Sequence, residues 1–127
     1  MSEYKKYINR LMKVKPINQV AIIDFSGEVI RKSDISHFED PEFEVFNLMF
    51  NHNTQIKSEY MQLSDITYHT KLTESHFLYG ENEEHGMMAV KTEKLYVIVL
   101  MKSGKDEFTQ ARRVMDEVAA TLRNLGL

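Results

Sequence analysis

The sequence has no cysteine and no tryptophan, and only two prolines and five glycines among its 127 residues. Without cysteine, disulfide frameworks, thiol nucleophiles and cysteine zinc sites are excluded. No apolar run approaches the ~20 residues that a bilayer-spanning helix needs, and the polar start SEYKK is not a signal peptide. With 43% hydrophobic and 28% charged residues, the chain has the composition of one soluble domain in a reducing cytoplasm.

Helical periodicity marks both ends of the chain and one segment near its middle. An amphipathic helix is predicted over residues 2–13, ended by Pro16, because apolar side chains recur at i, i+3, i+4 and i+7: Tyr4, Tyr7, Ile8 and Leu11. A second helix is predicted from Asp40-Pro41 to about Asn51. A long terminal helix is predicted from Asp106 as its N-cap to Gly126, with one continuous apolar face.

Short segments rich in branched apolar and aromatic residues predict strands between these helices. They cover residues 19–25, 28–33, 60–63, 66–72, 76–80, 87–90 and 95–101, and the last is expected to be central because it is nearly all apolar. Short turns favour antiparallel pairing, and helices with one apolar face must cover one side of the sheet. The predicted class is α+β, with a central antiparallel β-sheet.

Motifs for catalysis are missing from this sequence. It contains no phosphate-binding glycine loop, no GxSxG and no HExxH. No two histidines are spaced i, i+4 as metal ligands on a helix would be, and the acidic clusters are typical of solvated loops and helix starts. We therefore expect no enzyme, no metal and no cofactor. The net charge of −3 also argues against nucleic acid as a partner.

Two charged features are candidate binding surfaces. Cations gather on and just after the polar side of the first helix, where they could hold anionic lipid headgroups or simply form a solvated helix face: Lys5, Lys6, Arg10, Lys13 and Lys15. Arg112 and Arg113 follow Phe108 near the start of the last helix and are expected to point away from its apolar face. Arginine and aromatic residues are enriched in interface hot spots, although surface arginines beside a core phenylalanine give the same pattern.

The order of elements and several local strings resemble the profilin family. The opening EYKKYINRLM, followed by QVAIIDFSGEVI, is similar to the first helix, first strand and glycine turn of profilins. The end, GMMAVKTEKLYVIVLM and then VAATLRNLGL, is similar to the profilin GGITVKKT strand, the apolar strand after it and the terminal helix. The resemblance covers nearly the whole chain, although residues 34–58 match only as a helix of the right length.

The resemblance implies one profilin-like domain over residues 1–127, with the terminal helices on one sheet face and a further helix on the other. It also implies a cytoplasmic, cytoskeletal monomer that binds monomeric actin and regulates its polymerisation. Carried across by position, the actin-binding residues are Phe77, Tyr79, Lys91, Phe108, Thr109, Arg112, Arg113 and Glu117.

Profilins also bind proline-rich ligands on aromatic rings, and here the sequence departs from the family. The corresponding positions are Tyr4, Tyr7, Ile30, Leu122 and Leu127, of which only the first two carry rings. Because stacking on each ring contributes about 1 kcal/mol, we expect weak or absent affinity for proline-rich proteins. The tyrosines can alternatively pack between the terminal helices. A phosphoinositide membrane surface is the further partner implied, on the five cations of the first helix. The departures suggest a divergent member of the family, either archaeal or from an early-branching eukaryote.

Two alternatives from other classes remain open at this point. A roadblock-like or longin-like module combines a similar sheet and helices but acts as a dimeric scaffold for small GTPases. A ligand-sensing domain would need a cavity beneath the sheet. Topology alone does not separate these alternatives, because function depends on surfaces.

Overall fold

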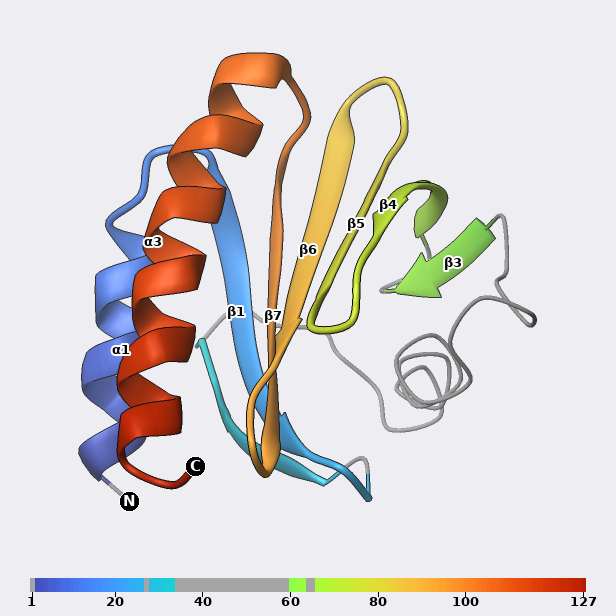
Figure 1. The fold of residues 1–127 in the computed structure, drawn as a ribbon. Helices are drawn as coiled ribbons and strands as arrows, with labels where there is room; N and C mark the ends of the chain where they lie inside the picture. Colours follow the sequence, from blue (N-terminus) through green and yellow to red (C-terminus); the bar gives the residue numbers. More distant parts are fainter. Residues whose placement is uncertain (1, 27, 34–59, 64–65) are drawn as a thin grey trace.

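The computed structural model describes residues 2–26, 28–33, 60–63 and 66–127. Within these residues, seven strands form one antiparallel sheet and a helix stands at each end of the chain (Figure 1). The elements are α1 (Ser2–Met12), β1 (Ile17–Asp24), β2 (Val29–Lys32), β3 (Tyr60–Leu63), β4 (Ile66–Thr73), β5 (Phe77–Glu81), β6 (His85–Lys91), β7 (Leu95–Lys102) and α3 (Lys105–Asn124). The predicted α+β class is confirmed. The helix predicted to begin at Asp40 lies outside the described residues.

Strand β7 lies inside the sheet, as its apolar sequence predicts. The strand order is β2-β1-β7-β6-β5-β4-β3, and β7 pairs with β1 on one side and β6 on the other. All its residues from Leu95 to Met101 are buried. A strand covered on both faces needs apolar side chains at every position, which explains the unbroken run.

Both terminal helices pack on the same face of the sheet, side by side (Figure 1). Alternation along β7 directs Val97, Val99 and Met101 toward these helices, while Tyr96 and Ile98 belong to the core on the opposite face. The helices contribute Tyr7, Ile8, Leu11, Ala111, Met115, Val118, Ala119 and Leu122 to the first core. No helix in the described ranges is long and apolar enough to cross a membrane.

The start of α3 differs from the prediction. The N-cap is Gly104 rather than Asp106, which lies in the first turn with Glu107 and there complements the helix dipole. Gly104 has φ of 145°, and its carbonyl accepts a hydrogen bond from the Phe108 N–H at 2.9 Å. A Cβ at this position would also collide with the Glu107 carboxylate. The last helix therefore begins where it does because residue 104 is a glycine.

Candidate functional site

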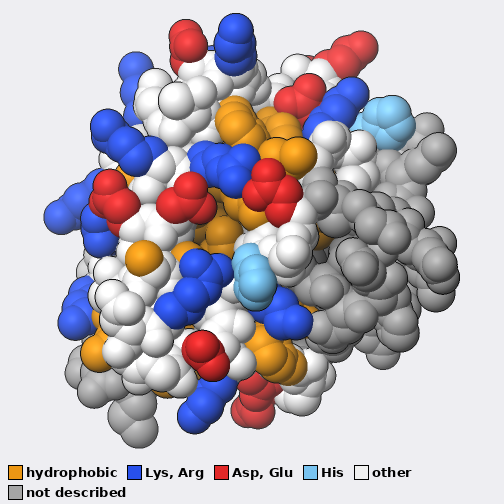
Figure 2. Space-filling model, in the orientation of Figure 1, with side chains coloured by type: hydrophobic (Ala, Val, Ile, Leu, Met, Phe, Trp, Pro, Cys, Tyr) orange, Lys and Arg blue, Asp and Glu red, His pale blue; other side chains and the backbone are white. Residues whose placement is uncertain are grey.

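One surface of the molecule combines arginine side chains with a partly exposed aromatic ring. It lies between α3, the strand β5 and the turn from β4 to β5. Figure 2 shows hydrophobic surface between α3 and the neighbouring strands, with acidic and basic side chains around it. We call this surface the docking face and define it by Glu74, His76, Phe77, Tyr79, Phe108, Arg112, Asp116 and Arg123.

The ring of Phe108 packs against two buried aromatic rings. Its centroid lies 4.7 Å from that of Tyr79 and 6.1 Å from that of Phe77, and both pairs are edge-on, with interplanar angles of 75° and 88°. Phe77 and Tyr79 are only 3% and 4% exposed, whereas Phe108 is half-buried. Phe108 is therefore presented to solvent on a rigid aromatic support, in a geometry that aromatic pairs favour.

Tyr79 is held as a neutral hydroxyl. Burial raises the pKa of Tyr79 well above its ordinary value, and the hydrogen bond from its hydroxyl to Glu81 Oε1, at 2.9 Å, acts in the same direction. On the neighbouring strand, a Cβ at Gly86 would come within 3.0 Å of the Tyr79 hydroxyl oxygen. The glycine thus leaves room for the ring that supports Phe108.

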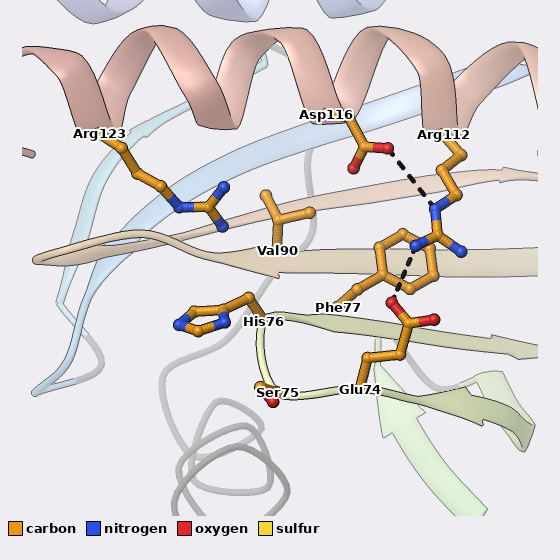
Figure 3. Close-up of a pocket in the computed structure, with 8 residues that line it drawn as sticks. All are labelled: Glu74, Ser75, His76, Phe77, Val90, Arg112, Asp116 and Arg123. Carbon is orange, nitrogen blue, oxygen red and sulfur yellow. Dashed lines mark hydrogen bonds and ion pairs between the residues drawn. The ribbon is translucent and has the colours of Figure 1, made fainter.

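Arg112 is fixed by three partners drawn from two segments of the chain (Figure 3). Its guanidinium carbon lies 3.9 Å from the Phe77 ring centroid, its Nη2 donates to Glu74 Oε1 at 2.9 Å, and its Nε lies 3.6 Å from Asp116 Oδ2. The expectation that Arg112 points away from the apolar face is wrong, since its guanidinium lies over the ring of Phe77, a core residue. Its side chain remains 29% exposed. The guanidinium is therefore ordered before any partner arrives.

A cleft of about 270 Å³ continues the docking face between α3 and the β4–β5 turn. Arg123 lies at its far end and donates from Nη2 to the Lys91 carbonyl at 2.6 Å, while His76 enters from the turn (Figure 3). Neither Arg123 nor His76 is among the binding residues predicted from the sequence. Arg123 follows Arg112 by eleven residues, or three helical turns, so helical spacing could have identified it. His76 has no such signal, because its place depends on how β4 and β5 pair.

The remaining residues carried across for actin are not all on this face, since the Lys91 side chain lies against Phe25 of the opposite core and Glu117 turns toward α1. Thr109 is exposed and its hydroxyl donates to the Lys105 carbonyl at 3.1 Å. Arg113 is exposed and makes no ion pair with a described residue. Lys91 is half-buried, with its ammonium 5.3 Å from the Phe25 ring centroid, and Glu117 forms an ion pair with Arg10 of α1. Phe77 and Tyr79 are buried supports rather than exposed contacts.

The residues assigned to a proline-rich ligand belong mainly to the core. Tyr7 is 5% exposed and Leu122 is fully buried, so neither offers a surface to a ligand, and both belong to the core that the terminal helices form with the sheet. Tyr4, Ile30 and Leu127 are half-buried against the same core. The predicted row of ligand contacts is thus reduced to three partly exposed side chains, of which one is aromatic.

The five cations of the first helix do not form one face. All are exposed, but Arg10 turns toward α3 and pairs with Glu117, and the Lys6 ammonium lies 5.2 Å from the Tyr7 ring centroid. Lys5 instead lines a groove between α1 and β2. The three cations of α1 itself thus have different surroundings, and Lys13 and Lys15 follow the end of the helix.

Comparison with known proteins adds to this geometry. The family model of Profilin matches residues 2–127. Profilin-1 of Caenorhabditis elegans is 24% identical over 131 residues, covering 99% of each chain. Profilin IB of Acanthamoeba castellanii is 21% identical, with a TM-score of 0.86 over 98% of this chain and 99% of that one. LokiProfilin2, solved in complex with rabbit actin, is 15% identical, with a TM-score of 0.78 over 98% of each chain.

Proposed function

Since this chain belongs to the profilin family, we propose that it binds monomeric actin through the docking face and so regulates actin polymerisation. The complex of LokiProfilin2 with rabbit actin supports the proposal, because that protein shares this fold and engages actin. Membership of the family also favours this function over a dimeric scaffold for small GTPases or a ligand-sensing domain. The proposed role is that of a non-enzymatic cytoplasmic monomer acting on the cytoskeleton.

The observation that carries the proposal is the ordered Arg112 beside Phe108. Interface hot spots are enriched in arginine and aromatic residues. A side chain that is ordered before binding also loses less conformational entropy when the complex forms. Arg112 is fixed by Phe77 and Glu74, and Phe108 is supported by two rings. Arg113, Thr109 and Lys105 are exposed nearby and supply a polar rim of the kind that surrounds such anchors.

The proposal is tested by the polymerisation of pyrene-labelled actin with and without the protein. The wild type is expected to slow filament nucleation, while R112E/R113E and F108A each remove this effect without loss of the fold by circular dichroism. Lys102→Glu is the control, because Lys102 is exposed at the end of β7. Actin binding would be refuted if the wild-type protein left the polymerisation curves unchanged. If the folded variants acted like the wild type, the actin-binding site would not be the docking face.

We further propose that proline-rich ligands bind weakly or not at all. The support is the burial of Tyr7 and Leu122 and the aliphatic character of Ile30 and Leu127, which leave Tyr4 as the one ring of the five positions that reaches the surface. A polyproline helix needs several flat aromatic surfaces to hold its rigid ridges.

We also propose that the protein associates with phosphoinositide membranes through α1. The support is the exposure of Lys5 on α1 and of Lys13 and Lys15 just after it, since each cation near an anionic surface contributes about 1 kcal/mol. Co-sedimentation with phosphatidylinositol bisphosphate vesicles that falls with rising salt is the expected result. The same recovery with neutral phosphatidylcholine vesicles would contradict it.

A further inference from the structure

A groove of about 320 Å³ runs between α1 and the edge strand β2. Its cations come from both elements, since Lys5 lies on the helix and Arg31 and Lys32 lie on the strand. The other lining residues are Ile8, Asn9, Met12 and Ser33. None of the lining residues belongs to the docking face, so the groove is a separate candidate binding surface.

The positive charge of this groove is not balanced by its own walls. No lining residue is acidic, and Lys5, Arg31 and Lys32 form no ion pair within the described ranges of the chain. On the docking face, by contrast, Arg112 meets two carboxylates. Because complementary charge steers association and selects between partners, the groove favours an acidic ligand.

Part of the groove lining is apolar. Ile8 is only 5% exposed, Met12 is half-buried, and both pack in the core beneath the helix. An aliphatic side chain that enters the groove removes apolar surface from water, which is favourable, whereas a phosphate group gains nothing from such contact. A membrane surface is broad and meets protruding cations rather than a hollow between a helix and a strand. Cations around apolar surface therefore favour a peptide with acidic and aliphatic side chains.

Strand β2 offers backbone groups as well as side chains. Among the described strands it pairs with β1 alone and forms one edge of the sheet. The free side of an edge strand carries N–H and C=O groups to which an extended peptide can add as a further strand. Ser33, at the end of β2, accepts the Val20 N–H on Oγ at 3.1 Å, and its own hydroxyl proton goes to no described residue. That proton is available to an oxygen of the ligand.

We propose that the groove between α1 and β2 binds an extended acidic segment of a partner protein, with aliphatic side chains between its acidic residues. The carboxylates pair with Lys5, Arg31 and Lys32, and the Arg31 guanidinium can hold one of them through two parallel hydrogen bonds. The aliphatic side chains cover Ile8 and Met12, and the peptide backbone extends the sheet beside β2. The inference goes beyond the proposed binding of actin, because it assigns a second protein partner to a different face.

The test is fluorescence anisotropy of a fluorescein-labelled acidic heptapeptide, EEVEIEE, titrated with the full chain. We expect saturable binding that weakens about tenfold in R31E/K32E and about threefold in K5E, because ion pairs with the peptide are replaced by repulsion. K94E/K102E is the matched control, since it reverses two exposed lysines outside the groove and changes the net charge equally. This control is expected to bind almost as tightly as the wild type, and thermal unfolding checks that each variant folds.

Two further measurements separate a peptide site from a site for any anion. The peptide EEGEGEE keeps the charge of EEVEIEE but lacks its aliphatic side chains, and we expect it to bind at least about fivefold more weakly. Met12→Gln keeps the charge of the groove and the length of the side chain. This variant is expected to weaken the binding of EEVEIEE and to leave that of EEGEGEE unchanged.

Each contrary outcome overturns the proposal for a distinct reason. If the wild type did not bind EEVEIEE, the groove would not be a peptide site, and binding of phosphatidylinositol bisphosphate vesicles by the same protein would assign its cations to the membrane instead. Equal losses in R31E/K32E and K94E/K102E would show that net charge alone matters. Equal affinity for the two peptides would exclude the apolar contact. None of these results bears on the proposed binding of actin, which is measured separately.

Discussion

The guanidinium carbon of Arg112 lies 3.9 Å from the ring centroid of Phe77, so a cation of α3 rests on a buried ring of β5. Glu74, from the turn that leads into β5, fixes the same guanidinium at 2.9 Å. The proposed actin anchor is therefore built jointly by the last helix and the strand below it.

Replacing Arg112 by lysine is expected to weaken actin binding although the charge is kept. Lysine loses both the contact with Phe77 and the planar guanidinium that meets Glu74, so the side chain must be ordered on binding at a cost of about 0.5–1.5 kcal/mol, or about two- to tenfold in affinity. Calorimetry with monomeric actin at low and moderate salt measures the change. If R112K bound as tightly as the wild type, the anchor would be a simple point charge.

Replacing Tyr79 by phenylalanine is expected to change how stability depends on alkaline pH. The folded protein raises the pKa of Tyr79 above the value of about 10 in the unfolded chain, so its contribution to stability is complete below pH ~10 and falls as the pH rises above that value. Y79F lacks this ionisation, and its free energy of unfolding should fall less steeply above pH ~10. Denaturant titrations at several alkaline pH values compare the slopes. Parallel slopes for both proteins would contradict the burial of this hydroxyl.

Reversing Glu117 to lysine is expected to loosen the contact between the terminal helices only slightly. The Arg10–Glu117 pair is about half exposed, and exposed ion pairs contribute about 0.2–1 kcal/mol. The double variant R10E/E117K should regain most of the loss, and high salt should reduce the difference. Urea unfolding of the single and double variants measures these differences in stability. The prediction would be contradicted if reversing both charges did not restore the stability lost in the single variant.

Restoring rings at Ile30 and Leu127 is expected to create affinity for polyproline. Both side chains are half-buried on the same core as Tyr4, and I30W/L127Y would add two flat surfaces beside it. Titration with a decaproline peptide followed by tyrosine and tryptophan fluorescence measures the gain over wild type. Micromolar binding by the wild type itself would contradict the proposed loss, and an inert double variant would remove Ile30 and Leu127 from the ligand site.

Local patterns in the sequence are enough to predict most of the fold that the structure describes. The spacing of Tyr7, Ile8 and Leu11 identifies α1, because burial of one helix face gives a periodic pattern of apolar residues. The apolar run from Leu95 identifies the central strand, because burial of both faces gives a continuous one. The N-cap of α3 was assigned to Asp106 instead of Gly104, since an acidic residue is a common cap and the positive φ of a glycine leaves no periodic signal.

The candidate site is less accessible to prediction than the fold. Arg112 and Phe108 were selected from residue type, but the burial of Phe77 and Tyr79 depends on the pairing of distant strands. The groove partners of Lys5 were missed for the same reason, since Arg31 and Lys32 reach it only when β2 lies at the edge of the sheet beside α1. Helical periodicity predicts which residues share one face of a helix, but the residues that contact this face are determined by the tertiary fold.

The geometry of the docking face also depends on Gly104, a residue with no side chain. Because an alanine there would be strained at φ of 145° and would push Glu107 aside, the first turn of α3 would have to re-form and carry Phe108 with it. A screen for lost partners would then score G104A as defective although the methyl group itself touches no ligand. The backbone conformation of Gly104 thus sets the direction in which α3 begins and, through it, the position of the Phe108 ring.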